Sequence, residues 1–287
     1  MMRDEGGRGQ FPSLLFDGAA STRRAAEQDA DRSFAEDLNL DQIVAAIAGD
    51  REERDHITRV LFDPLHDADA VRYRQEVFLD LEDPALTAEV QRFANLMSEV
   101  RVHLRQLPKM PYRYQREGWL LDAAAIYCDA VQSLAGQLVS AQISSRALLA
   151  FRDYLASYVA SAGFAALVSD TRDRKDALGR IRYCTRIRGG RVDVYRYQGE
   201  ADYSAVVLAT FDRFKQGAVK EYLIRYRTQP GMNHVAAQIL DLVARLFPEE
   251  FKALDEYCLQ HDGFLDGGIR RADQELSLIH ISEPTRP

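Results

Sequence analysis

Ile181-Arg-Tyr-Cys-Thr-Arg-Ile-Arg188 and Arg191-Val-Asp-Val-Tyr-Arg-Tyr197 flank the dipeptide Gly189-Gly190 in this 287-residue chain. Each run alternates polar residues with residues that favour β-strands, and a two-residue Gly-Gly loop is typical of a tight hairpin turn. This stretch therefore predicts an antiparallel β-hairpin. Elsewhere the apolar residues recur at helical spacing, so the sequence predicts a mainly α fold that carries one small hairpin.

The predicted hairpin has two different faces, one basic and aromatic and one apolar enough to pack on a helix or on further strands. Guanidinium groups bind phosphate oxygens through paired hydrogen bonds, so the basic face is suited to sequence-independent contact with a nucleic-acid backbone. The alternative is a solvated face on which Arg186 pairs with Asp193 and the other arginines only keep the sheet soluble. The predicted cross-strand pairs are Arg188 with Arg191, Arg186 with Asp193, Cys184 with Tyr195 and Arg182 with Tyr197 on the basic face, and Ile187 with Val192 and Thr185 with Val194 on the apolar face.

Long helices are predicted on both sides of the hairpin. Pro108 and Pro111 separate two of them, and a third weakens at Gly163 before a very polar stretch. After the hairpin the helical pattern returns, breaks at Pro230-Gly231 and ends in two helices divided by Pro248. We interpret the apolar stripes of the first three helices as core packing. These stripes are Leu86, Val90, Phe93, Met97, Val100, Leu104 and Leu107; Leu120, Ala124, Tyr127, Val131, Leu134 and Leu138; and Leu148, Phe151, Leu155, Tyr158 and Ala162.

The composition favours a cytoplasmic globular protein. The chain is 46% apolar and 28% charged, and its net charge of -7 argues against a generally basic coat, although a local basic face can still bind nucleic acid. No apolar run is long enough for a membrane helix, and Met1 to Gly9 lacks the apolar core of an export signal, so we expect no membrane association. Three widely spaced cysteines suggest neither a disulfide framework nor a zinc site.

The sequence offers little for catalysis. The histidines are isolated, and none has a histidine four residues away or cysteine neighbours for a metal. Paired acidic residues such as Glu249-Glu250 fit solvated helix faces, and no Gly-x-Ser-x-Gly motif suggests a hydrolase. We therefore predict no catalytic residue, no metal site and no cofactor site in this chain. A helical enzyme remains an alternative if the fold gathers these lone groups into one concave site.

Residues Leu276 to Pro287 are similar to the in-frame translation of a transposase adapter used in sequencing libraries. We therefore exclude this segment from the predicted fold. We also expect the natural gene to continue past Glu275.

Several segments between residues 34 and 275 resemble the core, lever and clamp region of the MutS family of DNA-repair ATPases, in the branch that lacks the N-terminal mismatch-reading domain. The resemblance implies that this chain contacts double-stranded DNA, and that the full-length protein is a homodimer whose C-terminal domain binds ATP and Mg²⁺. No Gly-x-x-x-x-Gly-Lys-Ser/Thr loop occurs here, and we assign no mismatch-wedge role to Phe34-Ala-Glu36. The segments are Asp37-Leu-Asn-Leu-Asp-Gln-Ile43, Pro64-Leu-His-Asp67, Val71-Arg-Tyr-Arg-Gln-Glu-Val77, Leu79-Asp-Leu-Glu82, Gln216-Gly-Ala-Val-Lys-Glu-Tyr222, Gln229-Pro-Gly-Met-Asn-His234 and Gly263-Phe-Leu-Asp266.

Combined with the periodicity, this resemblance predicts an elongated helical-bundle core with long lever helices and a small hairpin clamp. The alternative is a helical scaffold that binds protein partners and no DNA. The predicted DNA-binding residues are Arg182, Arg186, Arg188, Arg191, Tyr195, Arg196 and Tyr197. The predicted segments are a variable lead-in at 1–33, a helical core at 34–146, an outgoing lever at 147–180, a basic hairpin at 181–203, returning lever and core helices at 204–275, and the foreign tail at 276–287.

Overall fold

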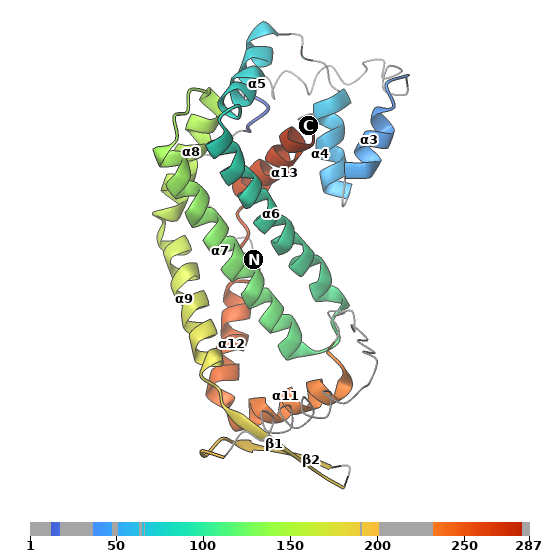
Figure 1. Cartoon of the computed structure of the whole chain (residues 1–287), viewed down its shortest axis with the longest axis vertical. Coiled ribbons are helices and arrows are strands. Elements are labelled where there is room, and N and C mark those ends of the chain that lie inside the picture. Colours follow the sequence, from blue (N-terminus) through green and yellow to red (C-terminus); the bar gives the residue numbers. More distant parts are fainter. Residues whose placement is uncertain are drawn as a thin grey trace, which may run out of the picture. The chain divides into compact units, whose positions relative to one another are not determined.

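A computed structural model describes residues 13–17, 37–47, 51–62, 65, 67–189, 191–200 and 232–282. The fold is mainly α with one two-stranded antiparallel hairpin in these residues, which confirms the predicted fold class (Figure 1). The predicted start of the returning lever, Ser204 to Tyr226, lies outside them. The elements are α3 (Leu40–Ile47), α4 (Arg51–Phe62), α5 (Ala68–Asp80), α6 (Pro84–Gln106), the short 3-10 helix η2 (Leu107–Lys109), α7 (Arg113–Ser140), α8 (Arg146–Val159), α9 (Ala162–Gly179), β1 (Tyr183–Arg188), β2 (Arg191–Arg196), α11 (His234–Leu246), α12 (Pro248–Gln260) and α13 (Gly267–Ser282).

The chain forms two compact units that do not follow the predicted segment boundaries. Unit 1 combines Met1–His103, Ala123–Ser169 and Gly263–Pro287, and unit 2 combines Leu104–Asp122 with Asp170–Asp262. The helices α6, α7 and α9 therefore each contribute residues to both units. The hairpin belongs to unit 2, together with α11 and α12.

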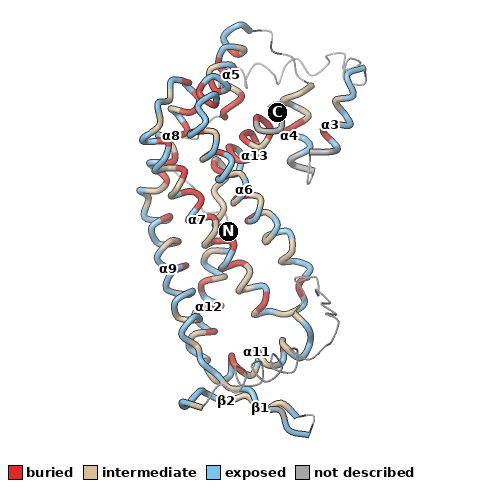
Figure 2. Tube along the Cα trace, in the orientation of Figure 1, coloured by how far each residue is buried: buried red, intermediate tan, exposed pale blue. Residues whose placement is uncertain are grey.

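The predicted apolar stripes form the core of the long helices. Figure 2 shows buried positions recurring along α7. Leu104 and Leu107 are only half-buried, and Ala162 is exposed, so the first and third stripes end earlier than predicted. The stripe residues that are buried are Leu86, Val90, Phe93, Met97 and Val100 on α6, Leu120, Ala124, Tyr127, Val131, Leu134 and Leu138 on α7, and Leu148, Phe151, Leu155 and Tyr158 on α8.

The predicted outgoing lever at 147–180 is two helices, and the break is not at Gly163. α8 ends at Val159, and α9 begins at Ala162 after Ser161. The Ser161 hydroxyl accepts a hydrogen bond from the backbone amide of Phe164 at 3.2 Å, which is the geometry of a helix N-cap. Gly163 lies inside α9, where a single glycine is tolerated.

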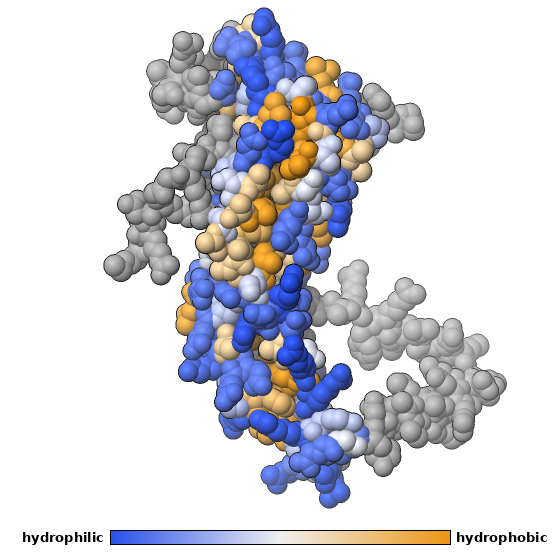
Figure 3. Space-filling view, turned by 90° about the vertical axis from the view of Figure 1, so that its left-hand side faces the viewer, coloured by the Kyte–Doolittle hydropathy of each residue, from blue (hydrophilic) through white to orange (hydrophobic). Residues whose placement is uncertain are grey.

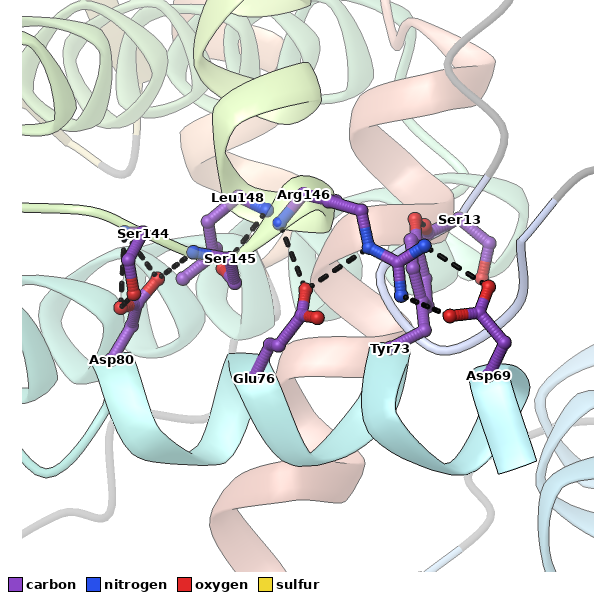
Figure 4. A network of polar contacts seen from close by, with 9 residues as sticks. All are labelled: Ser13, Asp69, Tyr73, Glu76, Asp80, Ser144, Ser145, Arg146 and Leu148. Carbon is purple, nitrogen blue, oxygen red and sulfur yellow. Dashed lines mark hydrogen bonds and ion pairs between the residues drawn. The ribbon is translucent and has the colours of Figure 1, made fainter.

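Three acidic side chains, Asp69, Glu76 and Asp80, join α5 to the beginning of α8 in unit 1 (Figure 4). The Asp80 carboxylate accepts hydrogen bonds from the backbone amides of Ser144 and Ser145 at 3.1 and 2.8 Å, and from the Ser144 hydroxyl at 2.8 Å. Burial alone would raise the pKa of Asp80, but these hydrogen bonds outweigh it and lower the pKa. Glu76 accepts hydrogen bonds from the Arg146 backbone amide and guanidinium, so the residues at the start of α8 are held on α5.

Asp266 starts α13 and links it to two tyrosines. Its carboxylate accepts hydrogen bonds from the backbone amides of Gly268 and Ile269, and from the Tyr154 hydroxyl at 2.6 Å. Its own amide donates to the buried Tyr127 hydroxyl at 3.2 Å. A Cβ at Gly268 would lie 2.6 Å from the Tyr154 hydroxyl oxygen, so a larger residue here would displace the Tyr154 side chain from Asp266.

The exclusion of residues 276–287 from the fold is wrong for residues 276 to 282, because α13 continues to Ser282. Leu276, Leu278 and Ile279 are buried. Leu276 and Ile279 extend a stripe that begins with Ile269 and Ala272, so the apolar spacing of the helix runs through the junction. Whatever the origin of these residues, their helical spacing lets them complete the core of unit 1.

We expect the double substitution Leu276→Ala with Ile279→Ala to lower the free energy of unfolding by several kcal/mol, since each buried aliphatic truncation costs about 2–5 kcal/mol. Chemical denaturation followed by circular dichroism measures this loss. Ser277→Ala, between the two positions and only half-buried, is the matched control. An unfolding free energy equal to that of the control would show that the segment contributes nothing to the core.

Candidate nucleic-acid interface

The hairpin has the register that its sequence predicts. β1 and β2 pair antiparallel, with Arg188 opposite Arg191 and Arg186 opposite Asp193. Beyond the ladder, the backbone amide of Tyr197 donates to the carbonyl oxygen of Arg182 at 3.3 Å. Gly189 has a φ of 53°, which is the left-handed conformation that a tight hairpin turn requires and that glycine adopts without strain.

One face of the hairpin packs on α11, as predicted. Val194 of β2 and Ile181, which precedes β1, lie against a buried apolar cluster. This cluster consists of Val243, Ala244 and Phe251. Figure 1 shows the two strands beside α11. Because this contact fixes which face is inward, it also fixes which side chains face outward.

Arg196 lies on the packed face and anchors the hairpin to the end of α11. Its Nε donates to the carbonyl oxygen of Leu246 at 3.1 Å, and its Nη2 donates to the same oxygen. The guanidinium also lies over the Phe247 ring, 4.7 Å from the ring centroid. A positive charge at a helix C-terminus binds the carbonyls that the helix leaves without partners and complements the helix dipole. Arg196 is therefore separated from the other predicted DNA-binding residues.

The other predicted arginines share the opposite, exposed face. Arg182, Arg186, Arg188 and Arg191 are all exposed. Arg191 forms an ion pair with Asp193 on its own strand, with Nε 3.3 Å from Oδ1. Asp193 therefore forms its ion pair with Arg191 and not with Arg186, the residue opposite it in the ladder. Arg182 and Arg188 form no ion pair with any residue in the described part of the chain. On the face drawn in Figure 3, hydrophilic side chains predominate at the lower end, where the hairpin lies in Figure 1.

Tyr195 and Tyr197 add aromatic surface to this basic face. The guanidinium of Arg186 lies over the Tyr195 ring at 5.2 Å, and hydrogen bonding to this tyrosine raises the pKa of Arg186. Tyr197 is 49% exposed, and it can present its ring to a ligand. The structure thus brings together six of the seven predicted residues on one face.

Two neighbours of this face did not enter the sequence prediction. Arg180, the residue after α9, is exposed and precedes the first strand. Glu200 supplies a negative charge at the open end of the hairpin, where it accepts from the backbone amide of Gln198 at 2.7 Å and from the Cys184 thiol. The backbone hydrogen bonds lower the pKa of Glu200. Glu200 follows Gln198 by only two residues, and this spacing is the signal in the sequence for their hydrogen bond.

We expect Arg196→Ala to loosen the hairpin from α11, whereas Arg188→Ala, which removes the same charge from the exposed face, should leave it in place. The physical reason is that only Arg196 binds the Leu246 carbonyl. Hydrogen exchange of the β1 and β2 amides should accelerate roughly tenfold in the Arg196 variant, since one charge-assisted hydrogen bond is worth about 1.5–3 kcal/mol. Equal exchange in the two variants would show that Arg196 has no anchoring role.

Unit 2 also contains an acidic pair that shares one arginine. Arg113 Nε donates to Glu117 Oε1 at 2.9 Å, and the same guanidinium forms an ion pair with Asp255 of α12. Burial raises the pKa of Glu117 to about 7, and the neighbouring Asp255 carboxylate adds to this rise while Arg113 opposes it. A shallow pocket of about 340 Å³ lies beside this group. Its lining residues are Leu107, Pro108, Arg116, Glu117 and Leu120.

The free energy of unfolding should fall as the pH rises from about 4.5 to about 7, because folded Glu117 retains a proton that the unfolded chain releases in this window. Above about pH 7 both states are ionised and this contribution is constant. We expect Glu117→Gln to reduce the proton uptake on folding by about one proton in this window, as measured by denaturation at several pH values. Glu256→Gln, which removes an exposed carboxylate from α12, should keep the wild-type pH profile.

The histidines that the structure describes do not gather into one site. His103 Nδ1 lies 2.9 Å from the carbonyl oxygen of Glu99, His261 Nε2 lies 2.9 Å from Asp170, and His234 begins α11. No group of three or more potential metal ligands occurs in the described ranges. In the part of the chain that the structure describes, none of the three cysteines forms a disulfide. Burial raises the pKa of both Cys128 and Cys258 to about 12.

The chain matches no protein-family model, no curated protein and no solved structure. Among the helices that the structure describes, none combines the length and the apolar character that crossing a membrane requires.

Proposed function

We propose that this chain is the non-catalytic, DNA-contacting part of a MutS-like repair or recombination ATPase, and that the exposed face of its hairpin binds the DNA backbone without sequence specificity. ATP and Mg²⁺ would act in a domain beyond Glu275. The observation that carries this proposal is that the two faces of the hairpin differ. Val194 and Arg196 hold one face on α11. The four exposed arginines, Arg182, Arg186, Arg188 and Arg191, lie on the other face.

Charge and geometry support a backbone ligand. The chain has a net charge of -7, yet residues 180 to 200 contain six arginines and only two acidic residues. Exposed guanidinium groups on a rigid strand pair can bind phosphate oxygens bidentately, and each contact releases counterions. Exposed tyrosines beside them can pack on sugars or bases. Reading a base sequence needs a helix or β-ribbon that enters a DNA groove and carries donors matched to the base edges. Contact with the phosphate backbone alone, as proposed here, needs no such fit.

A helical scaffold without DNA binding is the second candidate. It is favoured by the contacts that Arg186 and Arg191 already make with Tyr195 and Asp193 inside the hairpin. On this alternative the arginine face is only a solvated surface.

We expect Arg182→Ala with Arg188→Ala to weaken binding to a short DNA duplex by roughly tenfold or more at low salt, and to reduce the slope of log affinity against log salt by about two. These two arginines are chosen because the described part of the chain gives them no ion-pair partner. Fluorescence anisotropy over a salt series measures both effects, with duplexes of two unrelated sequences to test specificity.

The charge-matched control is Arg72→Ala with Arg105→Ala, which removes two exposed arginines from α5 and α6. If the control and the hairpin variant bind equally well, the hairpin is not the interface. If wild-type protein shows no salt-dependent binding to either duplex, the DNA-contact proposal is excluded.

A further inference from the structure

Residues Ser13 to Asp17 pack in unit 1, although the sequence predicts a variable lead-in over the first 33 residues. Leu14 is completely buried, and Ser13 and Leu15 are 4% and 3% exposed. The residues on either side lie outside the described ranges. The segment Ser13-Leu-Leu-Phe16 belongs to no helix or strand, so its backbone groups need partners from elsewhere.

Side chains of α5 and α13 supply these partners. Glu275 accepts hydrogen bonds from the Ser13 hydroxyl and from the Leu14 backbone amide, both at 2.6 Å. The Tyr73 hydroxyl donates to the Ser13 carbonyl oxygen at 2.7 Å, and Arg74 Nε donates to the Leu15 carbonyl oxygen at 2.8 Å. Figure 4 shows Ser13 beside the Tyr73 side chain.

The segment also has an internal organisation. The Ser13 hydroxyl oxygen accepts hydrogen bonds from the amides of Leu15 and Phe16, both at 3.0 Å, which is a serine turn. The Arg74 guanidinium lies 4.6 Å from the centroid of the Phe16 ring. The Ser13 hydroxyl both accepts the hydrogen bonds of the turn and donates to Glu275. These contacts therefore require a serine-like side chain at this position, in addition to the apolar residues that follow it.

Glu275 carries an electrostatic cost that the segment partly offsets. Burial raises the pKa of Glu275 to about 7, while the hydrogen bonds from Ser13 and Leu14 oppose that rise. A buried carboxylate without donors is unfavourable, and two short hydrogen bonds compensate it. The polar partners of the segment, Tyr73, Arg74 and Glu275, all precede Leu276.

The geometry points to a binding site for a linear peptide, formed by Tyr73, Arg74 and Glu275 and occupied here by the chain's own Ser13-Leu-Leu-Phe16 as a separable ligand. The site lies in unit 1 and is independent of the hairpin. Backbone recognition by side chains together with apolar anchors is the pattern by which grooves bind short peptides. Attachment within the same chain gives the motif an effective concentration in the millimolar range, so a free peptide competes only above that concentration or when the resident motif is weakened.

The first test uses the full chain with Leu14→Asp and Leu15→Asp, because buried aspartates should expel the resident motif. A labelled synthetic peptide of residues 11–17 should then bind this variant, as measured by fluorescence anisotropy, and should not bind the wild-type chain. The same peptide with Ser13→Ala should bind at least about tenfold more weakly, since it lacks the donor to Glu275 and the turn. Adding Glu275→Ala to the variant should remove binding of the unmodified peptide.

Equal binding of the two peptides, or no binding to a variant whose circular dichroism shows a folded protein, would overturn the proposal. If the variant does not fold, wild-type protein gives the decision. The Leu14 amide should be protected from hydrogen exchange, and a large excess of free peptide should accelerate its exchange by displacing the resident motif. Unchanged exchange in excess peptide would show that the segment is a fixed part of unit 1 and not a ligand.

Discussion

A two-stranded hairpin has too little surface to bury its own apolar side chains, and this constraint governs how the chain presents charge. The hairpin is stable only if one face lies on another element. Val194 and Arg196 supply that contact with α11, the first through an apolar cluster and the second through the Leu246 carbonyl. The requirement leaves the other face to solvent, and that is the face on which four arginines lie. The charge distribution of the candidate interface is thus a consequence of how the hairpin is held.

The parts of this arrangement that depend on neighbours in sequence could be predicted. The Gly-Gly turn and the alternation set the register, and periodicity located the buried stripes of α6, α7 and α8. The division of 147–180 into α8 and α9 was missed because it depends on Ser161, a residue with no strong breaker character. The role of Arg196 could not be predicted, because its partner Leu246 is 50 residues away. The Leu246 carbonyl oxygen can accept this hydrogen bond because α11 ends at that residue.

Three residues from the segments that resemble MutS proteins have identifiable local roles in this structure. Asp67, Asn233 and Asp266 are N-cap residues or accept hydrogen bonds from the first amides of α5, α11 and α13. Such residues are selected by helix starts, which any helical protein needs. These three residues therefore mark helix starts and give no support for DNA contact. The case for DNA contact rests on the exposed arginines of the hairpin.

Unit 1 is assembled from segments that are far apart in the chain, and this affects how the protein is made. Ser13 and Glu275 are separated by 262 residues, and Tyr127 and Asp266 by 139. A chain synthesised from its N-terminus cannot form either contact until α13 has left the ribosome, and non-local contacts of this kind slow folding. Unit 2 can close earlier, because Asp262 is its last residue. The hairpin and its arginines can then be in place while Leu14 still awaits Glu275. Until Glu275 is available the apolar Leu14 stays exposed, and exposed apolar surface makes a nascent chain prone to aggregation.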